Sequence, residues 1–122
     1  YFIGAKAFWL DERLKYFFPK FDKQRIEQGI HFKHIYDYEV KILSPNILKL
    51  KMNEYKFFPK QYSSSVAIDV FGDRVVTFYG VSPGSLSEEP VQFTMKSQTI
   101  ADGYRKYFNF MWSKLGKSVK KN

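Results

Sequence analysis

The stretch SVAIDVFGDRVVTFYG, residues 65–80, constrains the fold of this chain more than any other. Two runs rich in β-branched residues, which favour strands, flank the sequence Phe71-Gly72-Asp73-Arg74. Glycine adopts a positive φ at no steric cost, as the tight turns of β-hairpins require. The stretch therefore predicts a β-hairpin that turns at residues 71–74.

Other parts of the chain also have the features of strands. Alternation of apolar and polar positions, or a short apolar run with a clear end, marks residues 1–3, 30–40, 54–59 and 91–97. The first of these ends at Gly4, and the third is closed by Pro59. Residues 81–90, VSPGSLSEEP, are rich in Ser, Pro and Gly, so we expect a loop there.

Two helical segments are expected early in the chain. Residues 10–18 carry apolar side chains at helical spacing, and Asp11 suits the amino end of such a helix. Pro19 lacks an N–H donor and crowds the preceding turn, so we expect it to stop or kink that helix. Residues 20–29 predict a second helix, ended by Gly29.

The end of the chain predicts an amphipathic helix over residues 99–117, with Thr99 as its N-cap. Its apolar stripe consists of Ile100, Tyr104, Phe108, Met111 and Leu115, with Tyr107 and Trp112 beside it. A stripe of this kind is typical of a core or dimer face. We expect this helix to be the main packing or dimer element, chiefly through Tyr104, Phe108, Met111 and Trp112.

Together these elements predict an α/β (α+β) fold, in which a mixed β-sheet is flanked by helices. The 122 residues suit one domain, and a hydrophobic content of 44% with 20% aromatics indicates a packed core. Residues 43–53 fit either a short helix or an irregular connection. The first residue is Tyr1 rather than Met, so we expect residues 1–122 to be a piece of a longer protein.

Composition limits the classes of partner. A formal net charge of +8 favours polyanions, but the lysines are scattered, and only residues 114–122 concentrate charge, as in a solvated tail. The chain has no cysteine, which excludes disulfides and thiolate metal sites and suits a cytoplasmic protein. No apolar run is long enough to span a bilayer, so no membrane partner is expected.

The stretch HFKHIYD, residues 31–37, contains both histidines and a His-x-Lys pair. A strand here places His31 and Lys33 on one face and His34 on the other, so the histidines cannot converge on one metal ion. We expect partly exposed sheet histidines. Since the chain also lacks a Gly-rich phosphate loop and a nucleophile elbow, we expect no catalytic residues, no metal and no cofactor.

The hairpin resembles the active-site hairpin of phospholipase D-like domains, whose pattern is roughly His-x-Lys-x4-Asp-x6-Gly. With Asp73 at the aspartate position, Gly80 takes the glycine position, but Val66 and Ile68 stand where the histidine and lysine belong. The resemblance implies a phospholipase D-like half domain. It also implies that this domain is not an enzyme, because the imidazole nucleophile and the phosphate-binding cation are both absent.

Longer stretches are similar to the C-terminal region of archaeal TrmB-type transcriptional regulators, in which a catalytically degenerate phospholipase D-like domain follows a winged helix. They are the turn Gly4-Ala5-Lys6, the run Phe21-x3-Arg25-x3-Gly29-Ile30, and residues 54–76 and 96–112. Family members that bind sugars carry a further C-terminal β domain, and this chain ends before one could begin. Sugar sensing is therefore not expected.

The resemblance implies a non-catalytic regulatory domain that dimerises with a second copy and senses a small-molecule effector. DNA would be bound through an amino-terminal winged helix outside residues 1–122. The effector is expected where the lost active site was, near Ser64, Ser65, Val66 and Asp73.

Two other functions stay open at this point. The first is a degenerate phospholipase D-type phosphodiesterase or nuclease that borrows active residues from elsewhere. The second is a stand-alone nucleic-acid-binding module that uses the +8 charge.

Overall fold

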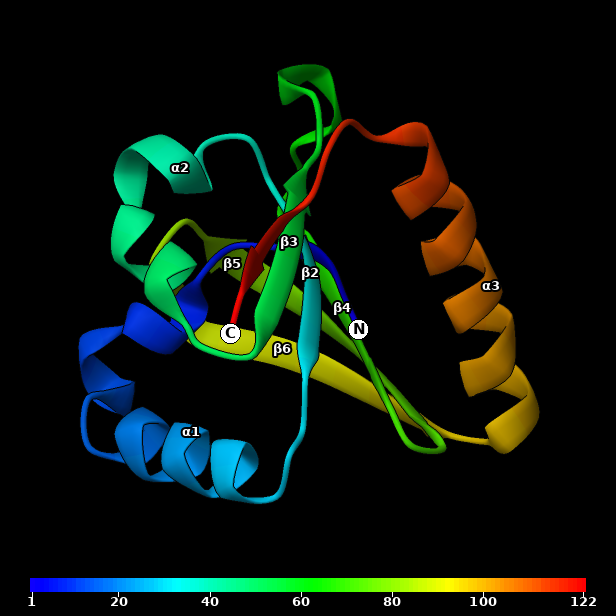
Figure 1. Cartoon of the computed structure of the whole chain (residues 1–122). Helices are drawn as coiled ribbons and strands as arrows, with labels where there is room; N and C mark the ends of the chain where they lie inside the picture. Colours follow the sequence, from blue (N-terminus) through cyan, green and yellow to red (C-terminus); the bar gives the residue numbers. More distant parts are fainter.

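The computed structural model describes the whole chain, Tyr1–Asn122, as a seven-stranded mixed sheet with helices on both faces (Figure 1). In chain order the elements are β1 (Phe2–Ala5), α1 (Phe17–Glu27), β2 (Phe32–Tyr36), α2 (Val40–Leu43), β3 (Asn53–Phe57), β4 (Val66–Phe71), β5 (Arg74–Ser82), β6 (Ser85–Lys96), α3 (Gln98–Lys114) and β7 (Val119–Lys121). The strand order across the sheet is β6-β5-β4-β1-β2-β3-β7. Strands β1, β2 and β3 are parallel, and every other neighbouring pair is antiparallel. The predicted α+β fold with a mixed sheet is confirmed.

The sheet separates two apolar layers. Helix α3 covers one face, and α1 and α2 lie on the other (Figure 1). Because alternate residues of a strand point to opposite faces, neighbours in sequence enter different layers. Ile3 and Ile35 pack with Phe108 of α3, whereas Phe2 and Phe32 pack with residues on the α1 side.

The connection from β1 to α1 differs from the prediction. Two 3₁₀ turns, Phe8–Leu10 and Glu12–Leu14, replace the helix expected over 10–18. Pro19 lies in the first turn of α1 and does not end a helix. The N–H groups of a first turn have no intrahelical partner, so proline removes no bond there. As predicted, the helix stops just before Gly29, whose φ is +71°.

Residues 43–53, for which the sequence fits either a short helix or an irregular connection, lie in the link from β2 to β3. They contain a 3₁₀ helix, Pro45–Lys49, which follows α2. Val40 of α2 and Ile47 of the 3₁₀ helix are buried against the sheet. This crossing therefore closes the core on the α1 side.

Two hairpins form the antiparallel half of the sheet. The predicted turn between β4 and β5 is confirmed, with Gly72 at φ +56°. The loop predicted at 81–90 is wrong, because only Pro83 and Gly84 form a turn and β6 begins immediately after it. Pro90 lies inside β6, which is an edge strand with an irregular register at this point, and such positions tolerate a residue without an N–H.

The N-cap of helix α3 lies two residues earlier than predicted, and the helix ends at Lys114 instead of residue 117. Its N-cap is Ser97 and not Thr99, since the Ser97 hydroxyl accepts a hydrogen bond from the Ile100 N–H at 3.3 Å. The expected solvated tail is also wrong in part, because β7 pairs antiparallel with β3. None of the helices combines the length and the apolar character needed to cross a bilayer.

Candidate ligand site between helix α1 and the antiparallel half of the sheet

The residues expected to line an effector pocket lie at two separate places. Ser64 and Ser65 precede β4, and Val66 is its first residue. Asp73 lies in the turn at the other end of that strand, beside Arg74. A strand rises about 3.3 Å per residue, so roughly 20 Å separates the two groups. The structure therefore does not bring these four residues into one site.

Next to Val66, a buried ion pair fills the space at the carboxyl ends of β1 and β2. The Lys6 Nζ lies 3.0 Å from Asp37 Oδ2, and the two side chains are 1% and 3% exposed. The ammonium group also donates hydrogen bonds to the carbonyls of Gly4, at 2.7 Å, and Val66, at 2.5 Å. Gly4 has φ +64°, and a Cβ there would lie 3.0 Å from the Val66 carbonyl oxygen. The Lys6 ammonium therefore occupies the space between Gly4, Asp37 and the Val66 carbonyl.

Burial has a clear effect on both groups of this ion pair. It lowers the pKa of Lys6 and raises the pKa of Asp37, although their mutual hydrogen bond acts in the opposite sense on each. A pair of this kind stabilises the fold only while both partners are present. We therefore assign Lys6 and Asp37 to the architecture of the domain and not to chemistry.

The stretch HFKHIYD does not form a surface site either. The prediction of partly exposed histidines is wrong for His34, which is buried with its ring stacked between Phe2 and Tyr36. Its Nδ1 donates to Asn53 Oδ1 at 2.7 Å, and burial lowers its pKa to about 3. His31 is exposed. No three His, Asp or Glu side chains gather in a way that could hold a metal ion.

A cavity of about 540 Å³ lies between α1 and the β4–β5–β6 half of the sheet. Its floor is set by strand register, because Phe2, Asp69, Val76 and Thr94 are direct neighbours across β1, β4, β5 and β6. Side chains paired in this way point to the same face of a sheet. The rest of the lining consists of Trp9, Phe21, Gln24, Arg25, Gln28, Ile30, Phe32, Phe71, Arg74, Phe78 and Gln92.

An acidic residue, Asp69, lies in the floor of this cavity. It is 6% exposed, and its carboxylate accepts no hydrogen bond from the protein. Burial raises its pKa to about 7, and the amino-terminal ammonium of Tyr1 opposes that rise. Asp69 also lines a small cavity of about 10 Å³, together with Lys6 and His34. A buried carboxyl group without partners is costly, and such groups concentrate at functional sites.

The two arginines of the cavity differ in availability. The Arg25 side chain is buried and donates to Asp22 and to the carbonyls of Ile30, Lys51 and Met52, so its guanidinium is fully used. It also stacks on the Phe32 ring. Arg74 is exposed and lies 3.9 Å from Asp73 at the hairpin turn. Neither arginine forms an ion pair with Asp69.

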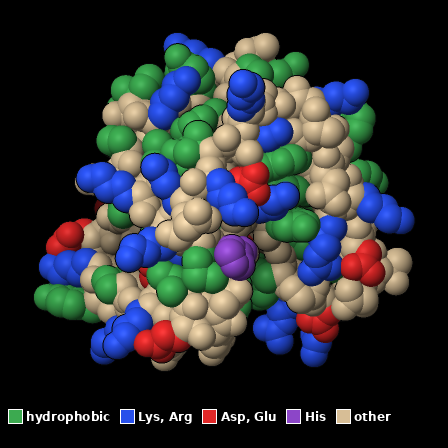
Figure 2. Space-filling model, viewed as in Figure 1, with side chains coloured by type: hydrophobic (Ala, Val, Ile, Leu, Met, Phe, Trp, Pro, Cys, Tyr) green, Lys and Arg blue, Asp and Glu red, His purple; other side chains and the backbone are tan.

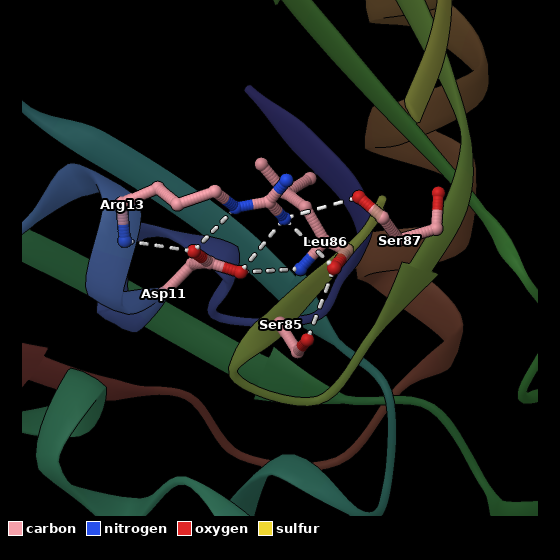
Figure 3. Close-up of polar contacts among 5 residues, drawn as sticks. All are labelled: Asp11, Arg13, Ser85, Leu86 and Ser87. Atoms are coloured by element: carbon pink, nitrogen blue, oxygen red, sulfur yellow. Dashed lines mark hydrogen bonds and ion pairs between the residues drawn. The ribbon is translucent and has the colours of Figure 1, made fainter. Parts of the chain in front are cut away.

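A clamp between Asp11 and Arg13 fixes one wall of the cavity to the sheet (Figure 3). Asp11 accepts hydrogen bonds from the Arg13 and Leu86 backbone N–H groups at 2.9 and 2.8 Å. The Arg13 guanidinium donates to Asp11 and to the Leu86 and Ser87 carbonyls. The clamp thus ties the segment that carries Trp9 to the start of β6. These contacts hold the pKa of the Asp11 carboxyl below its usual range.

Replacing Asp11 by asparagine is expected to loosen the β5–β6 hairpin. The amide loses the charge that strengthens these hydrogen bonds and cannot accept from both N–H groups and the guanidinium. We expect several-fold faster hydrogen exchange at amides 80–88 and a lower melting temperature. The matched control is Glu12→Gln, since Glu12 pairs only with the exposed Lys15. Equal exchange in both variants would show that the clamp does not hold the hairpin.

Comparison with known proteins supports the fold assignment. No protein-family model matches the sequence, and neither does any curated protein. The structure of TrmBL2, described as an archaeal chromatin protein that shows a novel mode of DNA binding, matches with a TM-score of 0.57. This chain shares the fold of part of the TrmBL2 chain. The match covers 95% of this chain and 45% of TrmBL2, at 12% sequence identity, so the likeness concerns the fold.

The sequence itself marks Asp69 as unusual, but the resemblance of the hairpin to the phospholipase D pattern draws attention away from this residue. That pattern draws attention to Asp73, which lies at the turn. In VAIDVF, however, Asp69 falls on the opposite face of the strand from Val66 and Ile68. A charged residue at an inward position of a buried strand is uncommon and marks a candidate site.

Proposed function

We propose that residues 1–122 form the non-catalytic regulatory domain of a TrmB-type transcriptional regulator, with an effector site in the α1 cavity. The observation that carries the proposal is the TrmBL2 fold, which extends over 95% of this chain. The sequence stretches similar to TrmB-type regulators give independent support. A fold alone does not define a function, so the site must agree with it.

The absence of catalysis is supported by the residues at the positions of the lost active site. Val66 and Ile68 occupy the histidine and lysine positions, and Ile68 packs in the apolar layers beneath α3. Both are unable to attack phosphorus or to bind phosphate. The neighbouring space is filled by the buried Lys6–Asp37 pair.

Dimerisation is part of the proposal, but the structure limits which residues can serve it. Phe108 is completely buried, and Met111 and Trp112 pack with it against the sheet. On α3, the large hydrophobic side chains that are exposed are those of Ile100, Tyr107 and Phe110, at 41%, 66% and 64%. A contact between two copies through α3 would therefore use these exposed side chains and not the buried Phe108.

DNA binding is assigned to a winged helix outside this chain. The charge of +8 favours some contact with nucleic acid by the chain itself. However, Lys and Arg side chains are scattered over the face shown in Figure 2 and do not form one stripe. A continuous basic stripe is the usual footprint of a nucleic-acid groove. This face therefore gives no support for specific DNA recognition by the chain itself, and we propose that a winged helix outside residues 1–122 supplies it.

Three measurements on the same sample test this proposal: hydrolysis, DNA binding and oligomeric state. We expect no hydrolysis of bis-p-nitrophenyl phosphate or DNA, and only weak DNA binding that is lost at physiological salt. Hydrolysis that disappears in His31→Ala/Lys33→Ala would replace the proposal by an enzyme. DNA binding that is tight and sequence-specific without any added domain would replace it by a stand-alone nucleic-acid binder. Sedimentation velocity measures the oligomeric state, and a monomer at high concentration would remove dimerisation.

A further inference from the structure

The α1 cavity has an unusual charge arrangement. Among its fifteen lining residues, Asp69 is the sole acidic one. Its carboxylate lies in the floor between Phe2 and Val76, which are its direct neighbours in the sheet. No cationic side chain of the protein forms an ion pair with it. The site therefore offers a buried negative group without a partner.

We propose that this cavity binds an organic cation, whose ammonium group pairs with Asp69 and whose apolar body lies against the surrounding aromatic rings. This inference rests on the function proposed above and assigns its effector to a chemical class. The ligand would supply the hydrogen bonds and the positive charge that Asp69 lacks. A charge-assisted N–H···O bond in a buried setting is among the strongest single contacts a small ligand can make.

The aromatic lining fits the second part of such a ligand. Trp9 and Phe21 stack with ring centroids 5.3 Å apart, and Phe21 also stacks with Phe32 at 6.4 Å. Phe78 extends the apolar wall on the side of β5. Aromatic faces attract cations as well as apolar groups. An amine with an aromatic or branched apolar body would satisfy both properties of the cavity.

The remaining polar groups argue against an anionic ligand. Arg25 already donates to one carboxylate and three carbonyls, so it has no free donor to offer an anion. Arg74 is exposed and has Asp73 beside it. An anion would also meet the Asp69 carboxylate, and burying like charges together is unfavourable. A volume of about 540 Å³ is within the range of small-molecule sites.

The test uses matched probes of nearly equal shape. These are 2-phenylethylamine, which carries the ammonium, 2-phenylethanol, which is neutral, and 3-phenylpropanoate, which is an anion. Each is titrated into the ¹⁵N-labelled chain while amide and Trp9 indole resonances are followed. We expect the amine to bind about tenfold or more tightly than the alcohol, and the anion to bind least. The largest changes in chemical shift should occur at Trp9, Phe78 and Gln92.

Two variants give the decisive comparison. In Asp69→Asn the shape of the site is kept and the charge removed, so amine and alcohol should bind equally. In Asp102→Asn, which changes an exposed acid on α3 on the other face of the sheet, the preference for the amine should be unchanged. If Asp69→Asn does not fold, the ranking of the three probes and the shift map of the original chain still decide.

Each outcome bears on a defined part of the argument. Equal binding of amine and alcohol, or an amine preference that survives Asp69→Asn, would overturn the cationic class but leave a ligand site in the regulatory domain. No binding of any probe would overturn the cationic site and also remove the effector part of the proposed function. Neither result would alter the phosphodiesterase and DNA-binding tests, which judge the regulatory assignment independently.

Discussion

Replacing Lys6 by methionine is expected to lower the free energy of unfolding by about 3–5 kcal/mol, because the Asp37 carboxylate then stays buried without a partner. The two groups are 3.0 Å apart and almost fully buried. Methionine has a similar length and no charge, so lost packing contributes little to the effect. The variant also removes the hydrogen bonds that Lys6 donates to the Gly4 and Val66 carbonyls.

The loss should depend on pH in a defined direction. Burial raises the pKa of Asp37 above its ordinary value, and removing Lys6 takes away the contact that opposes this rise. A carboxyl whose pKa is raised in the folded state binds its proton more tightly there than in the unfolded chain. Stability therefore increases as the pH falls from neutral toward the ordinary aspartate pKa. The Lys6→Met variant should regain part of its stability at pH 5.

Urea unfolding followed by tryptophan fluorescence at pH 7 and pH 5 measures both effects. The control is Lys20→Met, which removes an exposed lysine of α1 that makes no ion pair. A second variant, Lys6→Met/Asp37→Leu, should recover most of the loss, because an apolar pair can replace a buried ion pair. A loss below about 1 kcal/mol in Lys6→Met, or one independent of pH, would show that solvent reaches Asp37.

The sequence was most informative where structure depends on neighbouring residues. The turn at Gly72 and the strands on either side follow from local composition, and the structure confirms them. The predictions of a helix end at Pro19 and of a loop at residues 81–90 are both wrong, for the same physical reason. Proline is compatible with a first helical turn and with an edge strand, and sequence composition does not reveal which position a proline occupies.

The candidate site depended on contacts that are distant in the sequence. Lys6 and Asp37 meet because β1 and β2 are parallel neighbours, and the floor of the cavity joins residues from four strands. In the sequence, Asp69 is marked only by being a charged residue at an inward position of its strand. Its place in the floor of the cavity follows from its pairing with Phe2, which the sequence does not show. A local sequence pattern shows the alternation typical of a strand, but it does not show which other strand pairs with it.

In the absence of a ligand, Asp69→Asn is expected to raise the free energy of unfolding at pH 8 by about 1–3 kcal/mol. At that pH the folded state must hold an ionised carboxylate whose pKa is raised to about 7. Each unit of pKa shift corresponds to about 1.4 kcal/mol, and the burial of an unpaired amide offsets part of the gain. As the pH falls toward 5, Asp69 takes up its proton in the folded state first, so the original chain becomes more stable and the advantage of the variant shrinks.

His34 affects the pH dependence of stability in the opposite direction. Its contribution is the same in Asp69→Asn and in the original chain, so it cancels in the difference between them. Its pKa is lowered to about 3, so the unfolded chain binds a proton first, and stability is lost as the pH falls below about 6.5. In the original chain this loss and the gain from Asp69 nearly cancel between pH 6.5 and 5. The variant lacks the compensating gain and should lose stability steadily over that interval. Other ionisable groups near Asp69 are present in both chains, namely the Tyr1 ammonium, Lys6, Arg25, Tyr36 and Arg74.

The measurement is the difference in unfolding free energy between Asp69→Asn and the original chain at pH 8, 6.5 and 5, with Asp102→Asn as the control for an exposed acid. We expect this difference to change by about 2–3 kcal/mol over the range. A constant difference would mean that Asp69 titrates as a hydrated carboxyl. Such a carboxyl would gain little from an ammonium partner, because ion pairs in water contribute little. The same measurement therefore tests the physical basis of the proposed cation site without using a ligand.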